Sequence, residues 1–186
     1  MEMSKKDAKH FLYVGGLLCG FGAVAALLIG GAYVIANPLI EENRQKALEE
    51  ALSVCFANDD DTFSDAVSMP EECEYLSNYY IAYSSGEEYG YIYQGSGSNT
   101  YGSVEIAIGL TYADGELVYG CIGVIENTES YKTTLENNYI AVFNASPSQE
   151  SLNSISCGAT FGAKLIRNIV NEAVEYYLNT TIPEAA

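Results

Sequence analysis

The sequence has no tryptophan, one histidine and only eight basic residues against 25 acidic ones, in a chain of 186 residues. The net charge of −17 repels the phosphate backbone and excludes a nucleic-acid-binding role. Five cysteines without a Cys-x-x-Cys pair, together with a single histidine, give no zinc or iron–sulfur spacing. No nucleophile is paired with a base, so we expect neither a metal site nor an autonomous enzyme with catalytic residues of its own.

Charged residues are also absent from a run of 26 positions, residues 11–36. As a helix this run is about 39 Å long, against about 30 Å of hydrocarbon in a bilayer. We therefore expect one retained transmembrane helix. The alternative is a cleaved signal peptide, because Val34 and Ala36 are the small residues that precede such a cut, but its apolar core is only about 7–15 residues long.

The flanking charges predict the orientation of this helix. Lys5, Lys6 and Lys9 precede it, whereas Arg44 and Lys46 follow it among glutamates. The positive-inside rule then places residues 1–10 in the cytoplasm and the domain after the helix outside the cell membrane. From Asn37 onward there are five basic and 23 acidic residues, a net charge of −18, so basic partners and cations are better tolerated there than anions.

Small residues recur along one face of the apolar segment, and Gly16 and Gly20 form a G-x-x-x-G element. Such a seam is typical of close packing against another membrane helix. Glycine is also common in membrane helices in general, and both interpretations stay open.

Three further segments follow the apolar run. Helical spacing of apolar residues predicts a juxtamembrane helix over residues 37–57. Residues 58–72 are predicted to form an acidic linker, and residues 73–186 a domain.

The middle of the chain predicts β structure over residues 79–84, 89–94, 103–112 and 117–126. Strict alternation in the third segment predicts one buried face, and Asp114-Gly115 predicts a hairpin turn. Gly109, Gly120 and Gly123 inside these strands indicate bulges or the close approach of something flat.

Residues 161–178 return to helical spacing, with an apolar stripe that predicts packing on the sheet. The predicted fold class is therefore α+β: one N-terminal transmembrane helix, a small antiparallel sheet and a packed C-terminal helix. A disulfide among the four cysteines outside the apolar run, Cys55, Cys73, Cys121 and Cys157, stays open.

The approach to this last helix is the segment most suggestive of a binding site. Gly158 and Ala159 leave room for a bulky group, and Thr160 stands in the first helical turn, where free N–H groups attract anions. A phosphate ester on Thr160 would be held by those amides, and Lys164 could neutralise its remaining charge. The alternative is that Thr160 is an ordinary N-cap.

The motif Ser156-Cys157-Gly158-Ala159-Thr160 resembles the C-terminal signature of a known family, the flavin-binding subunits of ion-translocating membrane oxidoreductases. These are the G subunit of Rnf-type ferredoxin:NAD oxidoreductases and the related C subunit of the Na⁺-pumping NADH:quinone oxidoreductase. Their signature is Ser/Thr-Gly-Ala-Thr, whose last threonine carries FMN through a phosphoester. The resemblance implies that a flavin transferase attaches FMN covalently to Thr160.

The likeness extends over most of the chain. It includes one membrane helix that runs into an Asn-Pro segment, a Gly-x-Gly motif at Gly95-Ser96-Gly97, the pair Tyr101-Gly102, and Glu129-Ser130 at a loop expected beside the flavin. The chain departs from the family pattern in four respects: Cys157 replaces a hydroxyl residue, Gly162 replaces another, Tyr131-Lys132 stands where Pro-Gly is expected, and the Asp that precedes the signature falls near Asn153 or Ser154.

The resemblance implies a redox relay in an ion-translocating complex that contacts other membrane subunits through its transmembrane helix. In that role Tyr101 and Gly102 would flank the flavin ring, and Glu129 and Ser130 would bind its polar edge. The competing interpretation is an anchored structural or ligand-binding domain, either pilin-like or a flavin-free relative. A pilin-like helix normally has an early glutamate, and none occurs in residues 11–36.

Overall fold

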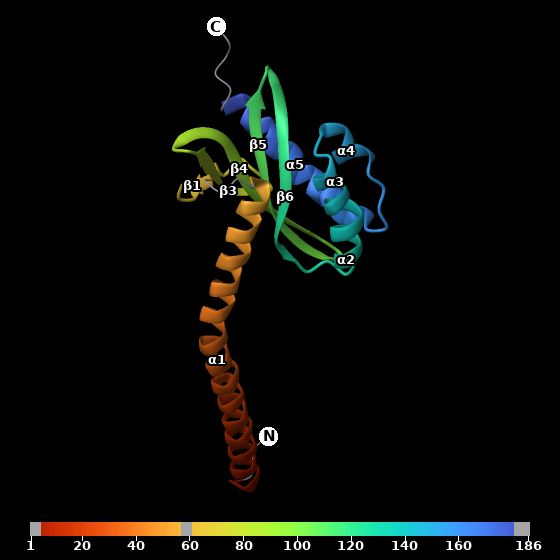
Figure 1. Cartoon of the computed structure of the whole chain (residues 1–186). Coiled ribbons are helices and arrows are strands. Elements are labelled where there is room, and N and C mark those ends of the chain that lie inside the picture. The colour runs from red at the N-terminus through yellow and green to blue at the C-terminus, as the bar shows by residue number, and fades with distance from the viewer. Residues whose placement is uncertain (1–4, 57–60, 181–186) are drawn as a thin grey trace. The chain divides into compact units, whose positions relative to one another are not determined.

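A long N-terminal helix, α1 (Lys5–Cys55), precedes a mixed α+β domain (Figure 1). The computed structural model describes residues 5–56 and 61–180. The chain divides into two units, residues 1–43 and residues 44–186. Helix α1 provides the described part of the first unit, and its residues 44–55 belong to the second.

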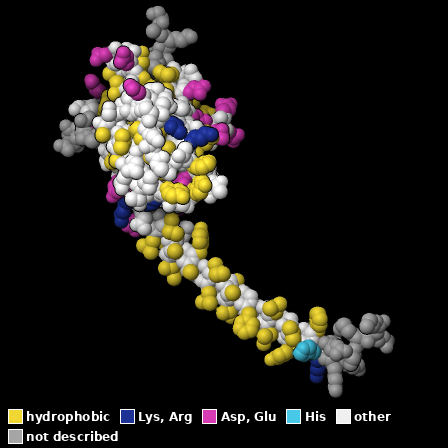
Figure 2. Space-filling model, turned by 90° about the vertical axis from the view of Figure 1, so that its right-hand side faces the viewer, with side chains coloured by type: hydrophobic (Ala, Val, Ile, Leu, Met, Phe, Trp, Pro, Cys, Tyr) yellow, Lys and Arg dark blue, Asp and Glu magenta, His cyan; other side chains and the backbone are white. Residues whose placement is uncertain are grey.

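The first unit is an apolar helix with its side chains exposed. Phe11, Leu18 and Ile29 are each more than 70% exposed, and hydrophobic side chains cover the visible face of this segment (Figure 2). A soluble helix would bury such residues, since each costs about 1.5–3 kcal/mol in water. This helix is long and apolar enough to cross a membrane, as predicted for residues 11–36.

The apolar segment and the helix predicted after it form one continuous helix, because α1 continues through Pro38. Proline removes one helical hydrogen bond, but the residues after it are rich in Leu, Glu, Gln, Lys and Ala, which favour a helix. The helix predicted over residues 37–57 is therefore the continuation of α1 rather than a separate element. Residue 57 lies outside the described residues.

The second unit contains one antiparallel sheet in the order β1-β3-β4-β5-β6, with β2 paired to β3. The four predicted strands are confirmed, and each is longer than expected. Two further short strands occupy part of the predicted linker over residues 58–72, of which residues 58–60 lie outside the described part of the chain. The strands are β1 (Asp61–Phe63), β2 (Val67–Ser68), β3 (Leu76–Ser84), β4 (Glu87–Asn99), β5 (Gly102–Ala113) and β6 (Glu116–Asn127).

Asp114-Gly115 closes the β5–β6 hairpin, as predicted. Asp114 has φ 54° and Gly115 φ 84°, the left-handed pair that a two-residue hairpin turn requires. Ser85-Gly86 closes the β3–β4 hairpin in the same way, with φ 52° and 85°.

The predicted buried face of β5 is confirmed over residues 104–110, and the opposite face of the strand is buried as well. Its residues 104–110 are all buried. On one face Ile106 and Ile108 pack with helix α5 (Thr160–Thr180). On the other face Ala107 packs with Leu52 and Cys55 at the end of α1. Alternation could not reveal this second cover, because it comes from a helix about 50 residues earlier in the chain.

The strand glycines allow the backbone at the end of α1 to lie directly against the backbone of the sheet. A Cβ on Gly123 would lie 2.3 Å from the carbonyl oxygen of Ala51, and one on Gly120 would lie 2.8 Å from that of Cys55. The register between β5 and β6 also shifts at two points. The predicted bulges are confirmed, and the sheet is closely approached at these glycines, but by the end of a helix rather than by something flat.

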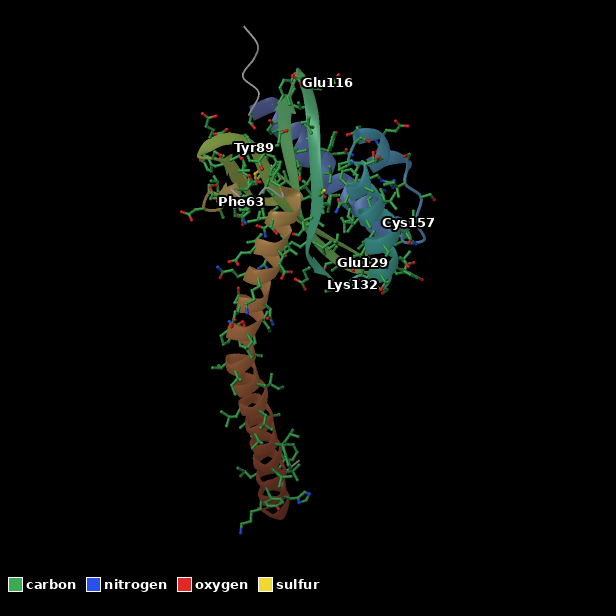
Figure 3. The ribbon with its side chains drawn as sticks, in the orientation of Figure 1. Phe63, Tyr89, Glu116, Glu129, Lys132 and Cys157 are labelled. Carbon is green, nitrogen blue, oxygen red and sulfur yellow. The ribbon has the colours of Figure 1, made fainter. Side chains whose placement is uncertain are left out.

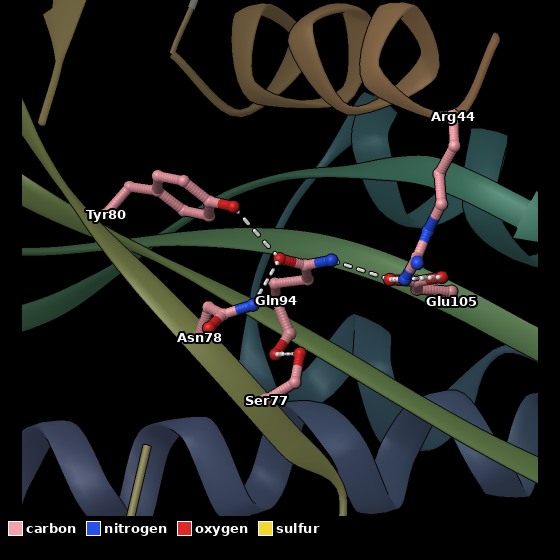
Figure 4. Close-up of polar contacts among 6 residues, drawn as sticks. All are labelled: Arg44, Ser77, Asn78, Tyr80, Gln94 and Glu105. Atoms are coloured by element: carbon pink, nitrogen blue, oxygen red, sulfur yellow. Dashed lines mark hydrogen bonds and ion pairs between the residues drawn. The ribbon is translucent and has the colours of Figure 1, made fainter. Parts of the chain in front are cut away.

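A polar network lies on the face of the sheet that α1 covers (Figure 4). Arg44 Nη2 donates to Glu105 at 2.9 Å, and Gln94 Nε2 donates to the same carboxylate at 2.6 Å. Gln94 Oε1 in turn accepts from Tyr80 OH at 3.0 Å and Asn78 Nδ2 at 3.1 Å. Burial, and then the charge of Glu105, raise the pKa of Tyr80. The network connects α1 with three strands.

The helix predicted over residues 161–178 is confirmed as α5, which begins one residue earlier and ends two later. Its stripe residues Leu165, Ile169 and Ala173 are buried, whereas Tyr176 is half-buried and Tyr177 takes the core position. Between β6 and α5 are short helices that the sequence analysis did not predict: α2 (Lys132–Leu135), the π-helical turn η1 (Glu136–Ile140), α3 (Ala141–Ala145) and α4 (Gln149–Ser154).

Candidate functional site

The tip of the β4–β5 hairpin is fixed against the loop that follows β6. Ser130 donates to the carbonyl of Tyr101 from its backbone N at 2.9 Å and from its Oγ at 3.0 Å. Gly102 has φ 147°, and a Cβ there would lie 2.5 Å from the carbonyl oxygen of Thr128. Only glycine allows the two segments to come this close. Ser130 and Gly102 therefore position Tyr101.

Glu129, in the loop that follows β6, is buried and only 5% exposed. Asn99 Nδ2 donates to its Oε1, and its backbone N donates to Asn127 Oδ1 at 3.0 Å. A buried carboxylate needs such partners, because removing it from water is costly. Its position is thus determined by both the hairpin tip and the end of β6.

Helix α5 begins at this same end of the domain. The N–H of Ala163 donates to the carbonyl of Ala159 at 3.0 Å, which makes Ala159 the cap and Thr160 the first helical residue. The N-cap alternative for Thr160 is therefore wrong. The amides of Thr160, Phe161 and Gly162 have no acceptor within the helix, and together they form its positive end.

These elements enclose a hollow of about 190 Å³. Its rim carries three aromatic rings, from the β4–β5 turn, the loop after β6 and the first turn of α5: Tyr101 is 40% exposed, Tyr131 52% and Phe161 60%. The Tyr101 ring lies 5.3 Å from that of Phe161 and 5.9 Å from that of Tyr131, measured between centroids. The lining residues are Tyr101, Glu129, Tyr131, Gly158, Ala159, Thr160, Phe161 and Gly162.

Half of the predicted site residues thus line one hollow: Tyr101, Glu129, Gly158, Ala159 and Thr160. The others lie around it. Ser130 and Gly102 do not line the hollow but position Tyr101 at its rim, as described above. Ser156 is exposed and Cys157 is half-buried in the loop that leads to α5. Cys157 packs against the main core cluster, and Figure 3 shows it together with Glu129 in this part of the domain.

Lys164 does not line the hollow of Thr160. It lines a neighbouring cavity of about 450 Å³ that shares Phe161 with the smaller hollow. Asn99 also lines this larger cavity while its amide binds Glu129 in the smaller one. The predicted contact of Lys164 with a phosphate on Thr160 stays a prediction.

The departures from the family pattern have local structural explanations. Gly162 is buried, and a Cβ there would lie 2.7 Å from Cδ2 of Leu135, so a larger side chain requires Leu135 to move. Lys132 N donates to the carbonyl of Glu129 at 3.0 Å, so the loop turns and enters α2 without a Pro-Gly pair. Lys132 lies beside Glu129 at this end of the sheet (Figure 3).

Three residues of the site were missed by the sequence analysis: Tyr131, Phe161 and Asn99. Tyr131 and Phe161 directly follow predicted residues and are large, exposed aromatics, which was the available signal. Asn99 gave no signal, because its role depends on the pairing of β4 with β5 and on a contact with residue 129.

Metal and disulfide chemistry find no support in the described residues. All five cysteines are free thiols, and no group of three potential metal-ligating side chains occurs within residues 5–56 and 61–180. Burial, and then the charges of Glu172 and Glu72, raise the pKa of Cys73, which disfavours its reactive thiolate.

Two comparisons with known proteins identify no relative. No protein-family model matches this chain, and no curated protein matches it.

Proposed function

We propose that this protein is a membrane-anchored electron-transfer subunit that carries FMN as a phosphoester on the hydroxyl of Thr160. In this proposal residues 11–36 span the cell membrane, residues 1–10 are cytoplasmic, and the domain is extracytoplasmic. The flavin-subunit resemblance suggests the role, and the arrangement around Thr160 supports it.

The observation that carries the proposal is the position of Thr160 among its neighbours. Thr160 is an exposed hydroxyl residue at the first position of a 21-residue helix, in a hollow rimmed by three aromatic rings. Two of the predicted flavin contacts, Tyr101 and Glu129, line the same hollow although they are distant in sequence. The residues that the resemblance implied separately are therefore neighbours in space.

The residues fit the cofactor in chemical type. The phosphate would lie at the free amides of α5, which favour anions. Phe161, which lines both this hollow and the neighbouring cavity, offers a ring face for stacking a flat group, a contact worth about 0.5–1.5 kcal/mol, and Tyr101 and Tyr131 add aromatic surface beside it. A Cβ on Gly158 would lie no closer than 3.4 Å to any neighbouring atom, so the approach to Thr160 is open.

Attachment requires an activated flavin, because a hydroxyl does not displace water from a phosphate monoester at a useful rate. A flavin transferase would use a flavin phosphoanhydride such as FAD. The Oγ of Thr160 would attack the phosphorus on the flavin side, the P–O–P bond would break, AMP would leave, and the threonine proton would pass to a base of the transferase. When bound, FMN supplies reversible uptake of electrons and protons, and the protein supplies its position and electrostatic surroundings.

The membrane helix suits this role, because a tethered cofactor reaches its redox partners without diffusing. Anchoring raises the effective concentration of the flavin near other membrane subunits. Those subunits would contact the segment around Gly16 and Gly20, where small residues permit close helix packing.

One observation favours the flavin-free alternative, a scaffold or ligand-binding domain that retains the fold. The buried carboxylate of Glu129 lies near the start of α5, with Oε1 3.3 Å from the place where a Gly162 Cβ would be. Its negative charge therefore already offsets part of the positive end of the α5 dipole, which would otherwise attract a phosphate. The two functions differ in whether a flavin stays bound after denaturation.

The test is in-gel fluorescence of the full-length protein, expressed with and without a flavin transferase and denatured before electrophoresis. We expect the wild-type band to fluoresce only with the transferase, and Thr160→Ala to be dark. Thr133→Ala is the matched control, because it removes the hydroxyl of an exposed threonine that lines neither this hollow nor the neighbouring cavity, and it should leave the band fluorescent. Mass spectrometry of the peptide over residues 156–164 then measures the added flavin phosphate.

A dark wild-type band with an active transferase would contradict the proposal and support the flavin-free scaffold. Fluorescence that persists in Thr160→Ala would show attachment at another residue.

A further inference from the structure

The cavity beside the Thr160 hollow is the larger of the two and is separated from it by Phe161 and Asn99. The smaller hollow, at about 190 Å³, is below the roughly 300–1,000 Å³ typical of sites for drug-sized ligands. The larger one, at about 450 Å³, is within that range. A phosphate and the start of its chain fit the first, whereas a three-ring system needs the second.

The walls of the larger cavity suit a flat ring with a polar edge. Phe161, Leu165 and Tyr75 provide apolar and aromatic surface. Asn99, Asn168 and Ser98 provide hydrogen-bonding groups, and Tyr75 is held in place by Asn168, whose Nδ2 lies 3.4 Å from its hydroxyl. This combination of apolar walls with a few polar groups is characteristic of cofactor sites.

Lys164 is the basic residue of this cavity. It is exposed, and no ion pair within 4 Å is found for it in the part of the chain that the structure describes. The acidic residue in the lining is Glu74, whose backbone N, rather than its carboxylate, binds Glu172. Because residues 37–186 carry a net charge of −18, an available ammonium group in a cavity of ligand size is well placed to recognise negative charge.

We propose that this cavity receives the flavin ring and that Lys164 contacts the polar edge of the ring rather than the phosphate. The inference rests on the proposed flavinylation of Thr160. A cation at the ring favours the form with more negative charge, which is the reduced form. Lys164 therefore raises the reduction potential of the bound cofactor, and Phe161 separates the phosphate end from the ring end.

The experiment uses the full-length flavinylated protein in detergent, titrated with dithionite in a spectroelectrochemical cell. We expect Lys164→Gln to shift the midpoint potential to a more negative value. Lys132→Gln is the matched control, because Lys132 lines neither cavity and lies 3.9 Å from Glu136. This control should leave the potential unchanged.

A second variant tests the cavity without relying on charge. Asn168 lies on α5, is half-buried and lines the larger cavity, so Asn168→Tyr should fill that space, and far-ultraviolet circular dichroism should show that the domain stays folded. We expect it to expel the ring, which would increase iodide quenching of flavin fluorescence and weaken the visible circular dichroism of the flavin. The covalent band in a denaturing gel should remain.

The outcomes separate this inference from the proposed function. If the flavin is covalently bound but neither lysine variant shifts the potential, or both shift it equally, Lys164 has no specific role and the inference is overturned. Unchanged iodide quenching in Asn168→Tyr would overturn the placement of the ring. If wild type carries no covalent flavin, the proposed function fails first and the inference fails with it.

Discussion

Substitution of Gly123 by alanine tests the junction between α1 and the sheet most directly. The added Cβ would lie 2.3 Å from the carbonyl oxygen of Ala51 and 2.5 Å from its Cα. Carbon atoms pack best at about 3.5–4.0 Å, so the helix end must move by about 1 Å. These are backbone atoms, which cannot rotate away as a side chain would.

The cost of this movement follows from what the junction buries. Overpacking a core typically costs about 1–3 kcal/mol, and a clash with backbone belongs at the upper end. Leu52 and Cys55, which are 6% and 4% exposed, lose packing when the helix end shifts. We expect a loss of about 3 kcal/mol in the free energy of unfolding, a large part of the roughly 5–15 kcal/mol that stabilises a typical domain.

The assay is urea unfolding of the full-length protein in mild detergent, followed by circular dichroism. Val118→Ala is the control on the same strand; Val118 is 45% exposed and should change stability by no more than about 0.5 kcal/mol. The rate at which Cys55 is alkylated, with the modified residue identified by mass spectrometry, reports local opening of the junction. A loss of about 3 kcal/mol should accelerate this alkylation by about a hundredfold, since each 1.4 kcal/mol corresponds to a factor of ten. A Gly123→Ala variant as stable as Val118→Ala, with unchanged alkylation, would refute the close approach of α1 to β6.

Two further changes test the same unit. Burial raises the pKa of Cys55 from about 9 to about 12, so the folded state binds this proton more tightly than the unfolded state; stability is fully retained below pH 9 and falls as pH rises toward 12. Cys55→Ala should remove up to about 1.4 kcal/mol per pH unit of that slope, as measured by urea unfolding at pH 8 and pH 11. Arg44→Ala should cost about 1–2 kcal/mol, because the carboxylate of Glu105 keeps Gln94 but loses its charged partner, which is half exposed and partly screened. An equal loss in Glu49→Ala, which removes an exposed charge on the same helix, would contradict this assignment.

The parts of the fold that were predictable depend on local sequence. The strand of alternating residues around Ile106, the Asp114-Gly115 turn and the helix that begins at Thr160 each have signals within a few residues. Such signals determine the type of an element but not what packs against it. The second buried face of β5 depends on α1, and no pattern inside residues 103–112 contains that information.

The site was predictable only in part for the same reason. Thr160 and its small neighbours form a contiguous motif, and Tyr101 and Glu129 were found through the resemblance. The spacing of four between Thr160 and Lys164 suggested a shared ligand contact. Phe161 and Asn99 divide that helix face into two cavities, a division that depends on how β4 pairs and that helical spacing cannot reveal.

If the proposed flavin is bound, the charges of the domain act on it at two different ranges. Most of the acidic residues are exposed, so at physiological ionic strength, with a Debye length of about 8 Å, their effect on the potential is strongly screened. Lys164 lines the larger cavity, so it would act on a flavin ring there at contact distance, where mobile ions cannot enter between the charges. The exposed acidic residues, which give residues 37–186 a net charge of −18, lower the reduction potential, and added salt should reduce this effect. The difference in potential between wild type and Lys164→Gln should persist. A difference that disappears with salt would mean that Lys164 is one more distant surface charge and that the ring lies elsewhere.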